Sequence, residues 1–358
     1  MKAFRRHRFL FAVASLGLVA AAVSAGACGG TDSRSGDEAA PVQINGAGAT
    51  FPYPIYSKWF DEYNKLYPEV RVNYQSQGSG AGIRQLTSQT VFFGASDGPM
   101  TDEQLAAAPG KILHLPTVLG ANVPVYNVPG LKTELTFSGP VLADIFLGKI
   151  TRWNDPAIAR LNAGATLPSS DITVVHRSDG SGTTYIWADY LAKVSPEWKS
   201  KVGVSTAVSW PGGIGGKGNE GVAGLVSQTP GSLGYIELIY ALQNKMSYGS
   251  VQNAAGEVVR ASARTVTAAA AATAAQMPDD FRVSITNAPG PGAYPISSFT
   301  WLLLYEDPKD KRQSKIMVDF MKWALTDGQT FAADLGYAPL PAALIALELT
   351  ALNRVRTE

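Results

Sequence analysis

The sequence predicts an α/β fold arranged as two lobes, and three observations support that prediction. From residue 44 onward, short apolar runs of strand length alternate with patterns of helical period, as in α/β proteins. Several of these apolar runs lead into loops rich in glycine and serine, and a helical pattern follows each loop. Residues 29–358 also provide enough chain for two lobes that each bury a core.

The apolar and periodic segments place the elements along the chain. Strands are predicted at the β-branched and aromatic runs 70–74, 91–93, 112–115, 123–126, 172–175 and 299–305. Helices are predicted over 55–66, 83–88, 185–191 and 318–325. The alanine-rich stretch 267–276 favours a surface helix that ends before Pro278, because alanine is the best helix former. The Pro- and Gly-rich stretch 287–295 is interpreted as a crossover.

The N-terminus has the pattern of an export signal. A basic stretch at residues 2–8 precedes an apolar stretch at 9–27 that ends in small residues. Cys28, the only cysteine, follows at the position of a lipoprotein cleavage site, so we expect residues 1–28 to be a signal peptide and Cys28 to be lipidated. A short membrane anchor and an incidental thiol are the alternatives. The polar residues 29–43 are predicted to be a flexible tether.

Composition excludes several classes of function. The formal net charge of +1 gives no reason to expect binding to nucleic acid. After residue 28 the chain has only two histidines, His114 and His176, and no cysteine, so neither a metal site nor a disulfide is expected. His114 lies in an apolar strand pattern and is interpreted as a core residue.

Three loops have the chemistry of an anion site. The strongest is 177–184, where a strand leads through Gly, Ser and Thr residues into a helix, so that backbone N–H groups and the helix dipole favour a negative charge. Ser181 and Thr183 add hydroxyl donors, and Arg177 adds a planar guanidinium that matches a tetrahedral oxyanion. Loops 46–52 and 78–82 repeat the arrangement, with donors expected at Thr50 and Phe51 in the first. Either of these two loops alone would be a weak signal, since glycine also favours turns for steric reasons.

Asp97 indicates which anion such a site would take. It stands at the end of a predicted strand, where an aspartate commonly caps a turn. Beside three anion-binding loops, its carboxylate would repel a fully ionised anion such as sulfate. It would accept a hydrogen bond from a phosphate that still carries a proton, so the hypothesis is a site for protonated phosphate.

Two enzyme-like motifs fit less well. Residues 94–98 match the G-x-S-x-G motif of serine hydrolases around Ser96, but Pro99 delays the helix that this motif requires. Residues 212–219 resemble a phosphate-binding P-loop, but Gly218 stands where Ser or Thr must follow Lys217. A mobile glycine-rich loop near the cleft is the better interpretation of 212–219.

Taken together, the motifs resemble the periplasmic phosphate-binding protein of the ABC-type phosphate transporter. The resemblance runs from about residue 44 to 340 and rests on six motifs in family order: 44–52 (INGAGATFP), 94–97 (GASD), 142–150 (LADIFLGKI), 177–183 (RSDGSGT), 215–219 (GGKGN) and 231–237 (GSLGYIE). It implies an α/β, type II-like periplasmic-binding-protein fold with one phosphate in a cleft between the lobes. Lobe one would comprise 44–118 and 293–358, and lobe two 119–292.

The resemblance also implies a role for each site residue. The phosphate contacts would be Thr50, Phe51, Ser79, Asp97, Arg177, Ser181, Gly182 and Thr183, with Asp179 supporting Arg177. The expected function is delivery of phosphate to membrane permease subunits by an exported, lipid-anchored monomer without a cofactor and without enzyme activity. A binding protein for sulfate or molybdate, a serine hydrolase, and a phosphate sensor or adhesin remain as alternatives.

Overall fold

The computed structural model describes residues 41–358. The predicted signal peptide, Cys28 and most of the predicted tether therefore lie outside the described residues. The first strand begins at Val42, so the last two residues of the predicted tether, Val42 and Gln43, are part of the fold.

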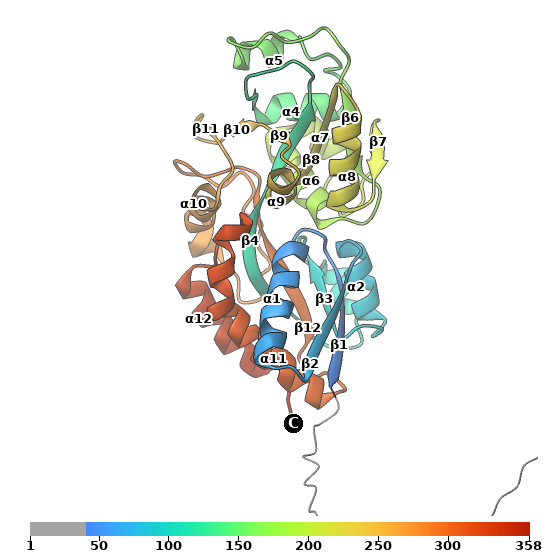
Figure 1. The fold of residues 1–358 in the computed structure, drawn as a ribbon, viewed down its shortest axis with the longest axis vertical. Helices are drawn as coiled ribbons and strands as arrows, with labels where there is room; N and C mark the ends of the chain where they lie inside the picture. The colour runs from blue at the N-terminus through green and yellow to red at the C-terminus, as the bar shows by residue number, and fades with distance from the viewer. Residues whose placement is uncertain (1–40) are drawn as a thin grey trace, which may run out of the picture. The chain divides into compact units, whose positions relative to one another are not determined.

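The described chain alternates strands and helices, which confirms the α/β prediction (Figure 1). The strands are β1 Val42–Gly48, β2 Val70–Ser76, β3 Phe93–Ser96, β4 Ile112–Asn127, β5 Thr136–Phe137, β6 Thr173–Arg177, β7 Ile214–Gly216, β8 Ser232–Glu237, β9 Ser247–Tyr248, β10 Ser250–Gln252, β11 Val258–Val259 and β12 Ser297–Tyr305. The α-helices are α1 Tyr53–Leu66, α2 Ser79–Thr87, α3 Asp102–Ala106, α4 Gly139–Phe146, α5 Pro156–Leu161, α6 Gly182–Val194, α7 Pro196–Lys201, α8 Gly218–Gln228, α9 Leu238–Gln243, α10 Ala263–Thr273, α11 Lys311–Leu325 and α12 Ala342–Ala351. Short 3-10 turns are η1 Ala274–Gln276, η2 Asp327–Phe331, η3 Ala333–Leu335 and η4 Leu352–Arg354.

One long strand joins the two halves of the main sheet. The strand order is β2-β1-β3-β12-β4-β8-β6-β7, with β9 also paired to β4, while β11-β10-β5 form a separate small sheet. Residues 112–121 of β4 pair with β12, and residues 122–127 pair with β8. The first half of the sheet thus holds β1, β2, β3 and β12, and the second half holds β6, β7 and β8 (Figure 1).

The predicted strands 112–115 and 123–126 are two parts of this single strand β4. Pro116 lies between the two predicted runs, and a proline removes a ladder hydrogen bond. In the structure Pro116 lies opposite Trp301, where the register of the β4–β12 pair shifts. An irregularity of this kind accommodates a proline without ending the strand.

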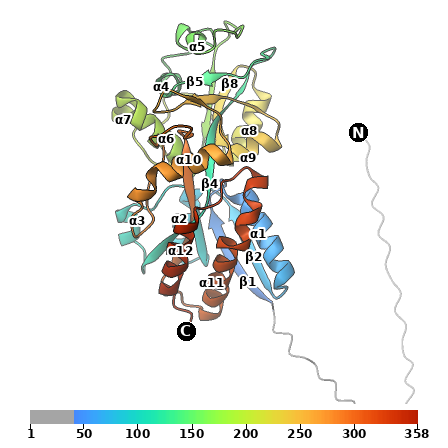
Figure 2. The ribbon, with the colours of Figure 1, turned by 90° about the vertical axis from the view of Figure 1, so that its left-hand side faces the viewer.

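Helices cover the two halves separately (Figures 1 and 2). Helix α1 buries Trp59 and Tyr63, and the ring of Phe60 packs against Phe320 of α11 beside the first half of the sheet. In the second half, the ring of Trp187 of α6 stacks on Tyr235 of β8. The helices predicted at 55–66, 83–88, 185–191 and 318–325 all lie within observed helices apart from residue 88, which directly follows α2.

Two sequence interpretations need correction. The alanine-rich helix α10 is not only a surface helix, because it buries Val266, Ala269 and Ala270. The segment 212–219 is not simply a loop: it contains strand β7, which pairs with β6, and the first turn of α8. Glycine dominates there because a Cβ on Gly216 would come within 2.7 Å of the backbone of α8.

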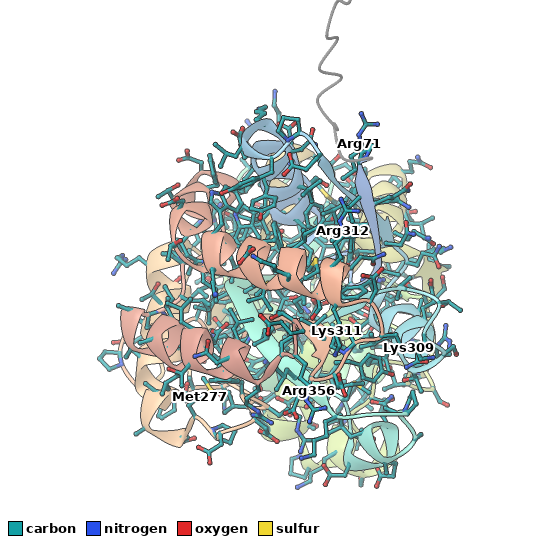
Figure 3. The ribbon with its side chains drawn as sticks, turned by 90° about the horizontal axis from the view of Figure 1, so that it is seen from below. Arg71, Met277, Lys309, Lys311, Arg312 and Arg356 are labelled. Atoms are coloured by element: carbon teal, nitrogen blue, oxygen red, sulfur yellow. The ribbon has the colours of Figure 1, made fainter. Side chains whose placement is uncertain are left out.

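The end of the molecule where the described chain begins carries several basic side chains (Figure 3). Lys311 and Arg356 at this end both pair with Asp307. Over residues 41–358, no helix combines the length and the hydrophobicity that a membrane span requires.

Candidate functional site

The N-termini of four helices from the two halves of the sheet meet at one place. Each follows a strand: α1 follows β1, α2 follows β2, α6 follows β6 and α8 follows β7. The backbone N–H of Gly182 on α6 donates to Ser79 Oγ on α2 at 3.0 Å. The side-chain amide of Asn219 on α8 donates to Thr50 Oγ1, just before α1, at 2.8 Å. Four helix N-termini so arranged create a region of positive potential between the halves.

Several backbone donors at these helix ends are unused. Within residues 41–358, the N–H groups of Thr50, Phe51, Ser79 and Thr183 donate to no protein acceptor. The first N–H groups of a helix have no partner within the helix, and such groups are ready donors to an anion. Glycine keeps the loops close together, since Gly80 N–H donates to Gly180 O at 2.9 Å.

Arg177 is the buried cation of the site, and Asp179 holds it in place. The guanidinium donates through Nε to Asp179 Oδ1 at 2.8 Å and through Nη2 to Asp179 Oδ2 at 2.6 Å. Its Nη1 reaches Thr183 Oγ1 at 3.3 Å. Burial would raise the pKa of Asp179, but the hydrogen bonds and charge of Arg177 outweigh it and lower that pKa below its usual value. Asp179 is therefore ionised at neutral pH.

Asp97 faces the same region and is only 1% exposed. Its Oδ1 accepts a hydrogen bond from Thr300 Oγ1 at 2.8 Å, and its Oδ2 lies 3.5 Å from Ser79 Oγ. Burial raises the pKa of Asp97 to about 7, against the lowering effects of Thr300, Arg177 and Ser79. The carboxyl group therefore changes charge near neutral pH.

The remaining predicted residues are also brought together, some with their donors already in use. Ser181 Oγ caps α6 by accepting from Thr184 N–H at 3.0 Å, and its own N–H donates to Thr206 O. Thr183 Oγ1 accepts from Asn219 Nδ2 at 3.3 Å, and Thr50 Oγ1 accepts from the same amide. Both threonine hydroxyl protons remain available to a ligand, because these hydroxyls only accept in those contacts.

Residue-by-residue reasoning had not singled out Thr300 and Asn219. Asn219 is fully buried and joins the halves, because its Nδ2 contacts Thr50 and Thr183 while its Oδ1 accepts from Glu237 N–H at 3.0 Å. It ends the motif 215–219, which was its only signal in the sequence. Thr300 lies 203 positions after Asp97, in a predicted strand with no polar motif, so no local pattern could have marked it.

The hydrolase alternative has no support in the geometry. The Ser96 hydroxyl is buried and bonded to the backbone of Gly98, and His114 Nε2 accepts from Met100 N–H at 3.1 Å. Burial lowers the pKa of His114 to about 3, so it is a neutral core residue as expected. Among residues 41–358, no hydrogen bond joins Ser96 to either histidine.

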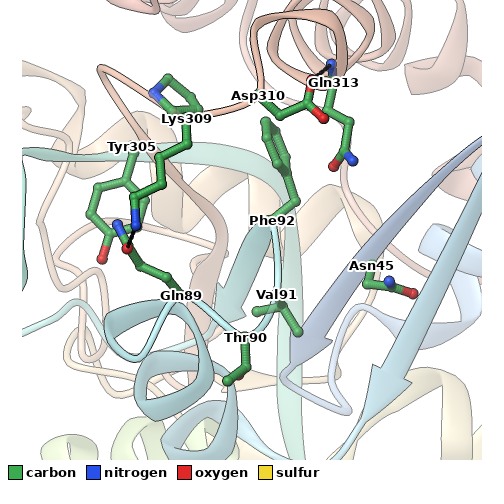
Figure 4. A pocket seen from close by; sticks show the side chains of 10 residues that line it. Asn45, Gln89, Thr90, Val91, Phe92, Tyr305, Lys309, Asp310 and Gln313 are labelled. Carbon is green, nitrogen blue, oxygen red and sulfur yellow. Dashed lines mark hydrogen bonds between the residues drawn. The ribbon is translucent and has the colours of Figure 1, made fainter.

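A pocket of about 240 Å³ lies away from these helix ends (Figure 4). Tyr305, the last residue of β12, lines this pocket together with Phe92 and Lys309. Lys309 Nζ donates to Gln89 Oε1 at 2.6 Å across its rim. The pocket shares no residue with the converging helix N-termini.

Comparison with known proteins agrees with this geometry. The model of the PBP superfamily domain matches residues 35–328. A phosphate-binding protein PstS of Xylella fastidiosa is 49% identical over 316 residues, covering 88% of this chain and 86% of that protein. The chain belongs to the PstS family of phosphate-binding proteins. A second member, from Pasteurella multocida, is 49% identical over 303 residues, covering 84% of this chain and 87% of that protein.

The fold of this PstS-family chain is shared with solved structures. The phosphate-binding protein of Stenotrophomonas maltophilia superposes with a TM-score of 0.67 at 19% identity, covering 86% of this chain and 93% of that one. The chain therefore has the two-lobed periplasmic-binding-protein fold that the motifs predicted.

Proposed function

We propose that this protein binds inorganic phosphate between the two halves of its sheet and delivers it to an ABC-type phosphate import permease. One observation carries the proposal: four unused backbone N–H groups lie beside one buried arginine and one buried aspartate. The names of the PstS relatives support phosphate as the ligand. The contacts we propose are Thr50, Phe51, Ser79, Asp97, Arg177, Ser181, Gly182 and Thr183, with Asp179 orienting Arg177.

The proposed site suits a protonated phosphate in particular. Arg177 is neutralised by Asp179, so hydrogen bonds rather than net charge supply most of the attraction. A hydrogen bond to a charged group contributes about 1.5–3 kcal/mol. Several such bonds, less the costs of desolvation and closure, are sufficient for binding at about micromolar Kd or tighter. Asp97 then accepts the proton of the phosphate, which sulfate does not have.

Binding and release follow from the two-lobed architecture. We place lobe one at 44–118 and 293–358 and lobe two at 119–292, so that β4 and the chain near residue 292 connect them. Opening at these connections would separate Ser79 from Gly182 and Thr50 from Asn219. This function involves no covalent step and no cofactor. We further propose that the protein is an exported monomer anchored at the membrane through Cys28.

Delivery to the permease can be tested directly. In vesicles that contain an ABC-type phosphate permease from the same organism, adding this protein with phosphate should stimulate ATP hydrolysis and phosphate uptake. Adding it with sulfate should have no effect. Phosphate binding without stimulation would favour the sensor or adhesin alternative and contradict the delivery proposal.

The proposed selectivity should depend on pH. The pKa of Asp97 is raised to about 7 by burial, so the carboxylate is mostly ionised at pH 8 and mostly protonated at pH 6. A protonated Asp97 can donate to a sulfate oxygen. Sulfate affinity should therefore rise as the pH falls through 7, while the pH dependence of phosphate affinity is weaker. Competition titrations across this range measure the change, and a pH-independent sulfate affinity would contradict this role of Asp97.

Gly182 offers a steric test of the site. A Cβ at this position would lie 2.5 Å from both Asp97 Oδ2 and Ser79 Oγ, where the halves meet. Gly182→Ala is expected to weaken phosphate binding by about tenfold or more, because overpacking a tight contact costs about 1–3 kcal/mol. Gly224→Ala on α8 is the control, since a Cβ there meets nothing within 4 Å. Equal phosphate affinities of the two variants would show that this contact is not part of the bound state.

A further inference from the structure

Asp97 has two carboxylate oxygens in different surroundings. Thr300 Oγ1 donates to Oδ1 at 2.8 Å from strand β12. Oδ2 faces the other half of the molecule, since a Cβ on Gly182 at the start of α6 would lie 2.5 Å from it. Thr300 thus donates to Oδ1, whereas Oδ2, the oxygen that faces α6, stays available to a ligand.

The hydroxyl of Thr300 has no competing acceptor role in this contact. Thr300 is fully buried. The hydroxyl of Thr117 donates to the backbone carbonyl of Thr300 at 3.1 Å and not to its side chain. A hydroxyl that donates to a buried carboxylate stabilises the charged form and fixes the orientation of the group. Asp97 N–H donates to Ser79 Oγ at 3.2 Å, so the aspartate backbone is held as well.

We infer that Thr300 is a positioning residue that sets the selectivity of the site for protonated over fully ionised oxyanions. This inference rests on the proposed function. By holding Oδ1, Thr300 keeps Asp97 as a charged acceptor whose Oδ2 is presented to the ligand. Without the hydroxyl, Asp97 holds its own proton more readily, and a protonated carboxyl group donates to sulfate as well as to phosphate.

The other side-chain hydroxyl beside the carboxylate is that of Ser79, 3.5 Å from Oδ2, and Ser79 is itself a proposed phosphate contact. The charged groups around Asp97 act on its charge but do not select one of its oxygens. The positive charge of Arg177 on β6 stabilises the ionised form of Asp97. In addition to burial, the negative charge of Asp97 raises the pKa of four neighbouring groups: Glu237 on β8, Tyr56 on α1, Tyr74 on β2, and Tyr337. Glu237 is fully buried, and burial raises its pKa well above its usual value. Thr300 is therefore the group whose removal changes the acceptor while leaving the cation of the site in place.

The test compares phosphate and sulfate dissociation constants at pH 8 for wild type, Thr300→Val and Thr300→Ser. We expect Thr300→Val to lower the sulfate-to-phosphate Kd ratio by about tenfold, because it removes a hydrogen bond to a charged group. Thr300→Ser should restore the ratio, and the pH at which sulfate binding appears should move upward in Thr300→Val. Thr117→Val is the matched control, because it removes an equally buried hydroxyl that bonds to Tyr56 and to Thr300 O but not to Asp97.

The outcomes separate this inference from the proposed function. If wild type does not prefer phosphate to sulfate, the proposed function itself is wrong. If wild type prefers phosphate and Thr300→Val keeps the same ratio, or weakens both anions equally, Thr300 is only structural and the inference is overturned. Should Thr300→Val fail to fold, Thr300→Ala removes the same hydroxyl and provides the same comparison with wild type and Thr300→Ser.

Discussion

Replacing Arg177 with methionine is expected to weaken phosphate binding by about 30- to 4,000-fold. Arg177 is 3% exposed and is the buried cation among the residues that converge at the helix N-termini. Truncating one member of a buried, hydrogen-bonded charge pair costs about 2–5 kcal/mol, and each 1.4 kcal/mol is a factor of ten in Kd. Part of the loss arises because Asp179 then keeps only the hydrogen bond from Gly218 N–H, and its carboxylate, no longer paired with a cation, repels the anion.

Calorimetric titration of Arg177→Met and Arg177→Lys with phosphate measures this effect. Lysine keeps the charge but cannot donate to both oxygens of Asp179 and to Thr183 as Arg177 does, so we expect an intermediate loss. Arg71→Met is the control, because Arg71 is an exposed residue of strand β2, and this variant should bind phosphate like wild type. Binding by folded Arg177→Met within threefold of wild type would contradict the role given to Arg177.

Replacing Asp97 with asparagine is expected to abolish most of the discrimination against sulfate. The asparagine amide can turn, so that its NH2 donates to an oxygen of sulfate in one orientation and its carbonyl oxygen accepts the phosphate proton in the other. We expect the sulfate-to-phosphate Kd ratio at pH 8 to fall by about 10- to 150-fold, the equivalent of one hydrogen bond to a charged group. Loss of the buried negative charge should also make the remaining sulfate affinity independent of pH near 7.

Asp319→Asn is the matched control for that substitution. Asp319 lies on α11 and pairs with Lys315 at the surface, outside the residues that converge at the helix ends. Its replacement should leave both dissociation constants unchanged. If Asp97→Asn keeps the wild-type ratio in the pH 8 titration, selectivity does not come from the acceptor at Asp97, and the role given to this residue is wrong.

Much of the fold could be predicted because its signals are local. The helical period of 55–66 and the alternation of strands and helices are properties of short segments, and they are observed where expected. The continuity of β4 could not be predicted, because Pro116 is accommodated only by the irregular pairing with β12, nearly 200 residues away in the sequence. The β7 strand was missed because the run 212–219 is dominated by glycine, which strand propensities disfavour.

The candidate site shows the same division between local and distant information. Loops that join a strand to a helix N-terminus have a sequence signature, so Thr50, Ser79 and Arg177 could be proposed from motifs alone. The partners of these residues come from elsewhere in the chain, as with Thr300 for Asp97 and Asn219 for Thr50. Those pairs depend on how strands are ordered in the sheet, which the spacing of residues does not encode.

The proposal as a whole is tested most directly by calorimetric titration of the ligand-stripped protein with phosphate and then with sulfate at pH 8. We predict one phosphate per chain with a Kd of about a micromolar or below, and no measurable heat from sulfate at the same concentrations. Comparable binding of both anions, or of neither, would contradict a phosphate site built on Asp97 and Arg177.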